Sequence, residues 1–442
     1  MTARVVVCAC LAAGTAGAQD SLPPGRALAL MGYYAGARAA VDLDEYEGRL
    51  YLTPVGGGTR AELRAGPAPD VLVVVPLGAD SSAAAARGAG ARVTVLGDDR
   101  LVLRGDTLRR VPTPRNRTVP IAEPEPPATT AVDTALVGEY GAEGRPLIVR
   151  ESHGRLELLA DSATVAPLAR VSGAVYRLAD VGPDAGGTAA FRRGPGGRPD
   201  AVTIGARAFP RRALPADDDR VNARTPPVRP VAELRREALA ATPPVEQGEF
   251  RRPDLVELRG LDPTIRYDIR YATSNNFMGV PFYTSAHAFL QRPAAEAVAR
   301  ASAALRPLGY GLLVHDAYRP WYVTKMFWDG TPPDKHVFVA DPSQGSRHNR
   351  GAAVDLTLCD LRTGAPIRMP GGYDEMSDRS YPLYPGGTSR QRWHRDLLRH
   401  AMEAQGFTVY EAEWWHFDYK DWRRYPIGTL TFEQLAARGA RP

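Results

Sequence analysis

The feature that most constrains this chain is a histidine and an aspartate within one short stretch, residues 346–358 (SRHNRGAAVDLTL). His348 and Asp355 lie seven residues apart, and Gly351 stands between them, where the backbone can bend without a Cβ penalty. Residues 353–358 form a short apolar run, which predicts a buried strand. An aspartate inside such a strand is costly unless it is paired or binds a metal ion. The stretch therefore predicts a carboxylate with a dedicated partner.

A second stretch, EWWHF at residues 413–417, supplies another histidine and another carboxylate. His348, Asp355 and His416 together make three protein ligands, the number that leaves a catalytic zinc ion one open position. Imidazole and carboxylate ligands without thiolate suit zinc at a hydrolytic site. Glu413 is then free to act as a general base. Either stretch alone is better explained by a core histidine or a turn aspartate, but the two together favour one zinc ion per chain.

These residues also carry a resemblance to a known family. The pattern Ser-x-His-x6-Asp at 346–355, followed by Glu-x-x-His at 413–416, resembles the zinc D-Ala-D-Ala metallopeptidases, and among them the D-alanyl-D-alanine dipeptidases of the vancomycin-resistance type. Further stretches that are similar to this family are YDIRYAT with NNF at 267–277, GYGLLV with DAYRP at 309–320, and DEMSDRS at 374–380. The resemblance covers residues 250–430 and implies an α+β zinc peptidase domain, an antiparallel sheet with flanking helices.

The resemblance implies roles for three more side chains, beside the same zinc ligands and base. Arg319 would face the metal and stabilise the oxyanion, a suitable task for a fixed guanidinium. The alternative for Arg319 is a surface salt bridge. Ser346 and Asp374 would hold the free ammonium group of a dipeptide. The alternative for Asp374 is a loop-capping role, because two glycines precede it and aspartate favours turns.

The predicted function is zinc-dependent hydrolysis of the D-Ala-D-Ala dipeptide in peptidoglycan metabolism. One alternative is a D,D-carboxypeptidase or peptidoglycan endopeptidase with the same zinc site, which would need an open groove and no carboxylate at the position of Asp374. The other is a non-catalytic cell-wall-binding protein with a vestigial zinc domain. The intact zinc-site residues speak against the second alternative.

The first residues predict export. Residues 1–18 have the pattern of a secretory signal peptide, with Arg4 at a positive end, an apolar run at 5–13 and the small-residue site AGA at 16–18. We expect a periplasmic or extracellular protein. Lipidation is disfavoured because neither early cysteine has a leucine three residues before it. No later apolar run is long enough to predict a transmembrane helix.

A diverged repeat occupies residues 28–113 and 135–212. LMGYY at 30–34 corresponds to LVGEY at 136–140. In both copies, short alternating apolar runs are bounded by Gly, Asp and Pro, which predicts two small all-β modules.

The segments 114–134 and 213–249 are rich in proline and polar residues and are predicted to be linkers, the second with a short helix at 231–241. Residues 250–442 hold all 6 tryptophans and seven of the 8 histidines, and form the predicted zinc domain. Within it, we expect helices at 293–305, 321–328 and 389–405, and strands at 264–271, 311–315, 353–358, 408–410 and 414–419.

Charge excludes one class of partner. The 55 basic and 50 acidic residues give a net charge of only +5, and no Lys/Arg-rich block is present, so nucleic-acid binding is not predicted. A mild positive excess favours contact with an anionic cell-wall surface, for which the β modules are the candidates.

Overall fold

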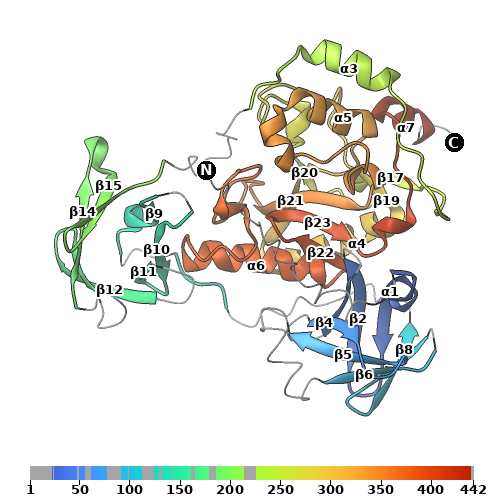
Figure 1. Ribbon diagram of the computed structural model, residues 1–442, viewed down its shortest axis with the longest axis horizontal. Helices are drawn as coiled ribbons and strands as arrows, with labels where there is room; N and C mark the ends of the chain where they lie inside the picture. Colours follow the sequence, from blue (N-terminus) through green and yellow to red (C-terminus); the bar gives the residue numbers. More distant parts are fainter. Residues whose placement is uncertain are drawn as a thin grey trace, which may run out of the picture. The chain divides into compact units, whose positions relative to one another are not determined.

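The computed structural model forms two compact units, residues 1–113 and 114–442 (Figure 1). The structure describes residues 22, 24–46, 49–54, 61–76, 91–97, 99–111, 124–128, 132–142, 144–160, 165–178, 186–213 and 225–439. The predicted signal peptide, residues 1–18, lies outside these ranges. No helix within them has the length and apolar character needed to cross a membrane.

The first unit is a closed barrel of eight antiparallel strands, which we call the first β module. Each strand pairs with the next along the chain, and the first also pairs with the last. Helix α1 (Pro24–Leu30) is followed by β1 (Gly32–Ala35), β2 (Ala40–Tyr46), β3 (Arg49–Pro54), β4 (Ala61–Ala65), β5 (Val71–Pro76), β6 (Arg92–Val95), β7 (Arg100–Leu103) and β8 (Asp106–Val111). Inward-facing leucines such as Leu43, Leu72 and Leu108 are fully buried and form its core.

The second unit begins with an eight-stranded antiparallel sheet, which we call the second β module. Its strands are β9 (Gly138–Tyr140), β10 (Leu147–Ser152), β11 (Arg155–Leu159), β12 (Val165–Ser172), β13 (Val175–Leu178), β14 (Thr188–Arg193), β15 (Pro199–Ile204) and β16 (Arg207–Pro210). Tyr140 bridges Arg211, just past the last strand, so the two edges of the sheet meet.

The two modules share a local arrangement at their first strand. The hydroxyl of Tyr34 donates a hydrogen bond to the carbonyl oxygen four residues earlier, at 2.9 Å, and that of Tyr140 does the same at 2.8 Å. Arg110 lies over the first ring and Arg211 over the second, 5.2 and 5.5 Å from the ring centres. These are corresponding positions of the sequence repeat, so its two copies form the same kind of β structure.

A five-stranded sheet forms the centre of the rest of the second unit, in the order β18-β20-β21-β23-β22. Its strands are β18 (Arg266–Tyr267), β20 (Tyr310–Asp316), β21 (Ala353–Asp360), β22 (Phe407–Tyr410) and β23 (Glu413–Tyr419). β18 runs parallel to β20, so the prediction of an antiparallel sheet is wrong at this edge. The strand expected at 264–271 is cut short because residues 270–272 form a 3-10 turn, in which Thr273 donates to the Arg270 carbonyl. A separate pair, β17 (Leu255–Glu257) and β19 (Phe289–Gln291), was not predicted.

Helices cover both faces of this sheet (Figure 1). α4 (Arg292–Leu305) and α6 (Ser389–Glu403) pack against one another and against the strands, while α5 (Trp321–Gly330) and α3 (Val231–Ala240) lie on the other side. α7 (Phe432–Gly439) follows near the C-terminus. α6 begins with a capping box, in which Thr388 and Gln391 each satisfy the other's backbone N–H.

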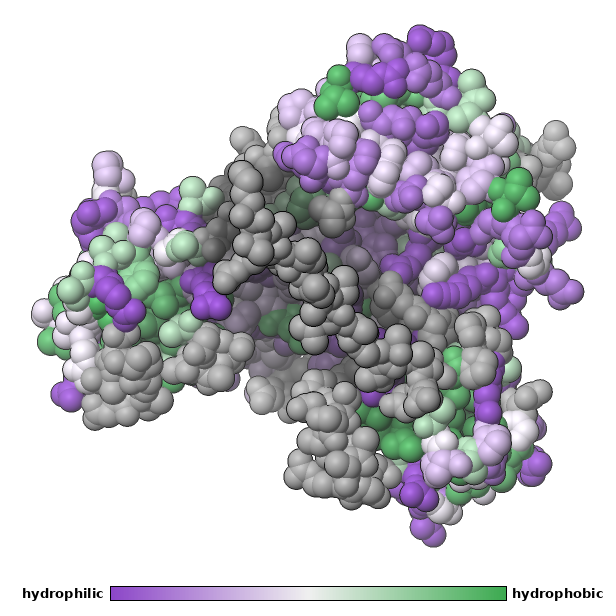
Figure 2. Space-filling view, in the orientation of Figure 1, coloured by the Kyte–Doolittle hydropathy of each residue, from purple (hydrophilic) through white to green (hydrophobic). Residues whose placement is uncertain are grey.

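The described part of segment 213–249, residues 225–249, lies against the domain that contains the five-stranded sheet. Leu234 and Ala238 of α3 are buried in the same hydrophobic core as the five-stranded sheet. The backbone N–H of Thr225 donates to the Phe277 carbonyl at 2.6 Å. The outer side of α3, at the top of Figure 2, is mainly hydrophilic. The helix is therefore amphipathic and contributes to the core of this domain.

Candidate metal centre

Three side chains predicted to bind metal converge in the structure. His348 lies in a 3-10 turn (His348–Arg350) that leads into β21, Asp355 lies on β21, and His416 lies directly opposite Asp355 on β23. The Asp355 Oδ1 atom is 3.0 Å from His416 Nδ1 and 3.4 Å from His348 Nε2, and the two nitrogens are 3.1 Å apart. Among the described residues, this is the cluster of histidines and acids whose ligand atoms could hold a metal ion.

The electrostatics of the cluster favour a cation at its centre. The three residues are almost fully buried, and Asp355 Oδ1 has no well-aligned hydrogen bond among the described residues. Burial alone would raise the pKa of Asp355, but the two imidazoles hold it well below its usual range. Burial lowers the pKa of His416, but Asp418 and Asp355 outweigh this and raise it to about 10. A buried carboxylate oxygen without a proper donor, facing two imidazole nitrogens, fits a divalent metal ion such as zinc.

Three neighbouring groups orient the ligands. The Nδ1 of His348 donates to the Ala317 carbonyl at 2.7 Å, and the Nε2 of His416 bonds to Asp418 Oδ1 at 2.9 Å. The Tyr373 hydroxyl donates to Asp355 Oδ2 at 3.0 Å. Each contact directs the opposite atom of the ligand toward the common centre, as outer partners do in metal sites.

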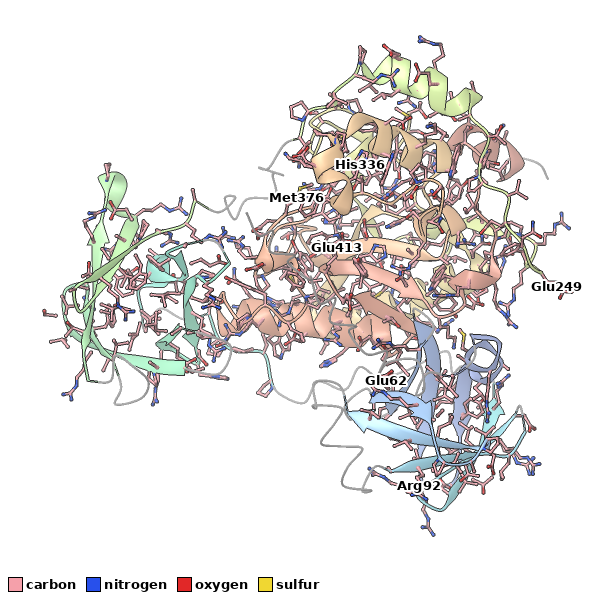
Figure 3. The ribbon with its side chains drawn as sticks, in the orientation of Figure 1. Glu62, Arg92, Glu249, His336, Met376 and Glu413 are labelled. Atoms are coloured by element: carbon pink, nitrogen blue, oxygen red, sulfur yellow. The ribbon has the colours of Figure 1, made fainter. Side chains whose placement is uncertain are left out.

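Glu413 lies at the edge of the cluster. It is the first residue of β23 (Figure 3). Its Oε2 atom is 3.8 Å from His416 Nδ1. Its side chain is partly exposed, and the loss of water around its carboxyl group, together with the charge of Asp355, raises its pKa. Glu413 is therefore close enough to act on a group bound at the centre, while it stands outside the three-residue cluster.

Arg319 is held rigidly beside the cluster. Its Nε and Nη2 atoms donate to Asp316 Oδ2 at 3.1 and 2.8 Å, and the side chain is buried over the rings of Tyr271 and Phe327. Asp316 itself is fixed by the Tyr283 hydroxyl at 2.7 Å. Arg319 is thus no surface residue, and its guanidinium has a fixed direction.

Asp374 has a strained backbone, with a φ of +54°, a value that non-glycine residues rarely adopt. Its Oδ2 atom accepts a hydrogen bond from the Tyr271 hydroxyl at 3.1 Å. Burial, together with the charges of Asp355 and Glu413, raises the pKa of Asp374 well above its usual range. The carboxylate therefore lies close enough to the cluster to interact with its charges, and a positive charge beside it would be stabilised.

Comparison with known proteins decides the family. Residues 251–433 match the Peptidase_M15 family model, described as D-ala-D-ala dipeptidase. The chain is 34% identical over 188 residues to the D-alanyl-D-alanine dipeptidase of Escherichia coli (strain K12), which is 42% of this chain and 96% of that protein. It is 33% identical to the D-alanyl-D-alanine dipeptidase of Enterococcus faecalis over 38% of this chain and 92% of that protein, and 35% identical to that of Streptomyces coelicolor over 36% and 87%.

This chain belongs to the D-Ala-D-Ala dipeptidase family. The family consists of zinc-dependent metallopeptidases, which agrees with the histidine and aspartate cluster of this chain. The part of the chain that matches the dipeptidases includes every predicted site residue and excludes both β modules. We call residues 251–433 the dipeptidase domain.

The structure adds site residues that the sequence did not reveal in the dipeptidase domain. They are Tyr271, which contacts Asp374 from 103 residues away in the sequence, and Tyr373, which contacts Asp355 from 18 residues away. Asp316 differs from them, because it lies three residues before Arg319 and its place in the sequence already suggested that it orients this arginine. The role of Asp418 as a partner of His416 could have been predicted from the sequence. The two residues are two positions apart on β23, and residues at that spacing on a strand point to the same face.

The contacts of Ser346, predicted to bind substrate, are local. Its Oγ atom accepts from the His348 N–H at 3.2 Å, and its own N–H donates to Asn349 Oδ1 at 2.7 Å. Ser346 therefore helps to shape the turn that presents His348. Its role toward the substrate stays a prediction.

Proposed function

We propose that this protein is a zinc-dependent dipeptidase that hydrolyses free D-Ala-D-Ala, with one zinc ion bound by His348, Asp355 and His416. The observation that carries the proposal is the placement of Asp374 beside the metal cluster. The Tyr271 hydroxyl that donates to Asp374 lies 3.4 Å from the Tyr373 hydroxyl, which donates to Asp355. The names of the curated relatives, all D-alanyl-D-alanine dipeptidases, support the same substrate.

A zinc ion at this cluster would supply Lewis-acid chemistry, which polarises a carbonyl group and makes a water molecule more acidic. The protein must then move the proton of that water. Glu413 is suited to this task because its carboxylate is 3.8 Å from a ligand nitrogen and its raised pKa favours proton uptake. The same carboxyl group can deliver the proton to the leaving amine.

Arg319 would stabilise the oxyanion that develops as the peptide bond is attacked. Two of its guanidinium nitrogens are used by Asp316, and among the described residues Nη1 has no hydrogen-bond partner. A donor that is fixed before the reaction stabilises developing charge without a cost of reorganisation.

Asp374, with Ser346 as a second contact, would bind the free ammonium group of the dipeptide. An ammonium beside a half-buried carboxylate makes a charge-assisted hydrogen bond, which is about twice as strong as a neutral one. The strained backbone of Asp374 supports this role, since such strain often marks functional positions.

A D,D-carboxypeptidase or endopeptidase with the same zinc site is the second candidate. It would accept a chain that continues beyond the amino end of the scissile pair, and would have no use for a carboxylate there. The presence of Asp374 favours the dipeptidase over this candidate. A non-catalytic wall-binding protein is disfavoured by the complete set of ligands, base and arginine.

We further propose that the protein is exported and acts in the periplasm or outside the cell, on the pattern of residues 1–18. The β modules would then be available for contact with the cell-wall surface.

The metal assignment is tested by removal of one ligand. His348→Ala should abolish both stoichiometric zinc and dipeptide hydrolysis, because two protein ligands bind zinc much more weakly than three. Zinc per chain is measured by elemental analysis. His336→Ala is the matched control and should keep both properties, because His336 (Figure 3) lies outside the cluster. Its ring lies tilted against that of Trp328, with ring centres 3.8 Å apart. Full zinc content in His348→Ala would remove it from the ligand set.

A further inference from the structure

The second β module contacts the segment that carries Asp374. We call residues 371–388 the substrate loop, because it begins just before Asp374 and ends at the N-cap of α6. This loop has a strained residue near its start and only short 3-10 structure within it. Such a conformation persists only where the surroundings hold it in place.

The first part of the substrate loop is held by its own buried carboxylate. Glu375 is only 5% exposed and accepts hydrogen bonds from the Gly372 N–H at 2.8 Å and the Ser377 hydroxyl at 2.6 Å. Arg379 forms an ion pair with it at 2.9 Å. A Cβ atom at Gly371 would lie 2.5 Å from the Arg379 carbonyl oxygen, so the two ends of this turn touch. Asp374 therefore lies inside a closed ring of contacts.

Tyr384 connects this ring to the second β module. It is buried, and its hydroxyl donates to Oε1 of Glu139 on β9 at 2.9 Å. Its own backbone N–H donates to the Tyr381 carbonyl at 3.0 Å, and the Tyr381 N–H donates to the Asp378 carbonyl at 3.2 Å, so Tyr384 is joined to the 3-10 turn of the loop. Glu139 is 1% exposed, and its other carboxylate oxygen pairs with Arg212. The acceptor for Tyr384 is thus a rigid, charged group of the module.

A second buried carboxylate of the module holds the end of the loop. Glu151 on β10 is 2% exposed, and its Oε2 accepts from the backbone N–H of Ser389 at 2.9 Å, at the first turn of α6. Its own N–H donates to the Gly387 carbonyl at 3.1 Å, and Arg392 Nη2 donates to its carbonyl oxygen at 3.0 Å. A carboxylate at this place also interacts favourably with the helix dipole.

We propose that the second β module is a positioning element for the substrate loop, so that Glu139, through Tyr384, fixes the place of Asp374 and thereby the affinity for the dipeptide. This inference rests on the proposed role of Asp374. A β module that served only as a wall-binding appendage would have no reason to bury two carboxylates against this loop. Burial of an ionised carboxylate is costly unless charged or polar partners compensate it, and here the loop provides them.

The test is Tyr384→Phe in the full-length protein, which removes one hydroxyl and keeps the ring. The KM for free D-Ala-D-Ala should rise roughly two- to tenfold, the range that corresponds to the net free energy of one hydrogen bond, with a smaller change in kcat and unchanged zinc content. Glu139→Gln, which weakens the acceptor, should raise KM less. Tyr381→Phe is the matched control, because Tyr381 is in the same loop but 49% exposed.

Hydrogen exchange separates this inference from the proposed function. Backbone amides of residues 372–380 should exchange faster in Tyr384→Phe than in the wild type or Tyr381→Phe, whatever the substrate. If exchange is faster in Tyr384→Phe but the wild type does not hydrolyse the dipeptide, the proposed function is refuted. The inference that the module positions the loop would still stand. Unchanged exchange and unchanged KM in Tyr384→Phe, or equal changes in Tyr381→Phe, would overturn the inference.

Discussion

Substitution of Glu413 by glutamine is expected to keep the bound zinc and to lower kcat about 100- to 10,000-fold, the usual contribution of a positioned general base. Glutamine has nearly the same size but cannot take up a proton. Zinc should stay because Glu413 lies 3.8 Å from a ligand nitrogen and outside the three-residue cluster.

The measurement pairs elemental analysis with kcat under substrate saturation. Glu411→Gln is a suitable control, because Glu411 is exposed in the turn before β23 and should keep full activity. Loss of zinc in Glu413→Gln would show that Glu413 is a ligand and that the assignment of the base is wrong.

Substitution of Asp374 by asparagine should have an effect of similar size, but on substrate affinity. Removal of one partner of a charge pair that the bound dipeptide would bury costs about 3–5 kcal/mol, which corresponds to a loss of roughly a hundredfold or more in kcat/KM for the free dipeptide. Asparagine can still accept the hydrogen bond of Tyr271, so the loop should keep its conformation.

Asp378→Asn provides the control for this change, since Asp378 is an exposed acid in the same loop. It should leave kcat/KM within the range of the wild type. A loss in Asp374→Asn that came with a lower melting temperature and lower zinc content would instead support a loop-capping role for Asp374.

The candidate metal cluster could be predicted from sequence because its parts lie in two short stretches. His348 and Asp355 stand on the two sides of one turn, and Glu413 and His416 stand on one short strand. The confirmed recognition of the family rests on the same spacings. Helices α4 and α6 were predicted nearly in full, because Pro293 at the start of the first and Gly406 just past the second mark their ends.

What the sequence could not predict are contacts between distant segments. Tyr271 and Tyr373 have no pattern that distinguishes them from core tyrosines, yet both bond to carboxylates of the site. The parallel pairing of β18 depends on two residues only, too few for a periodic signal. The link between Glu139 and Tyr384 joins residues 245 positions apart and includes a module outside the family match.

The most direct test of the dipeptidase assignment is a comparison of two substrates with the wild-type protein. Free D-Ala-D-Ala carries an ammonium group that can pair with Asp374, whereas N-acetyl-D-Ala-D-Ala is uncharged at that end and would leave the carboxylate without a partner. We predict efficient, zinc-dependent hydrolysis of the free dipeptide and a kcat/KM for the acetylated one that is lower by roughly a hundredfold or more. Equal rates on both, or a preference for the acetylated dipeptide, would contradict the dipeptidase assignment and favour the carboxypeptidase.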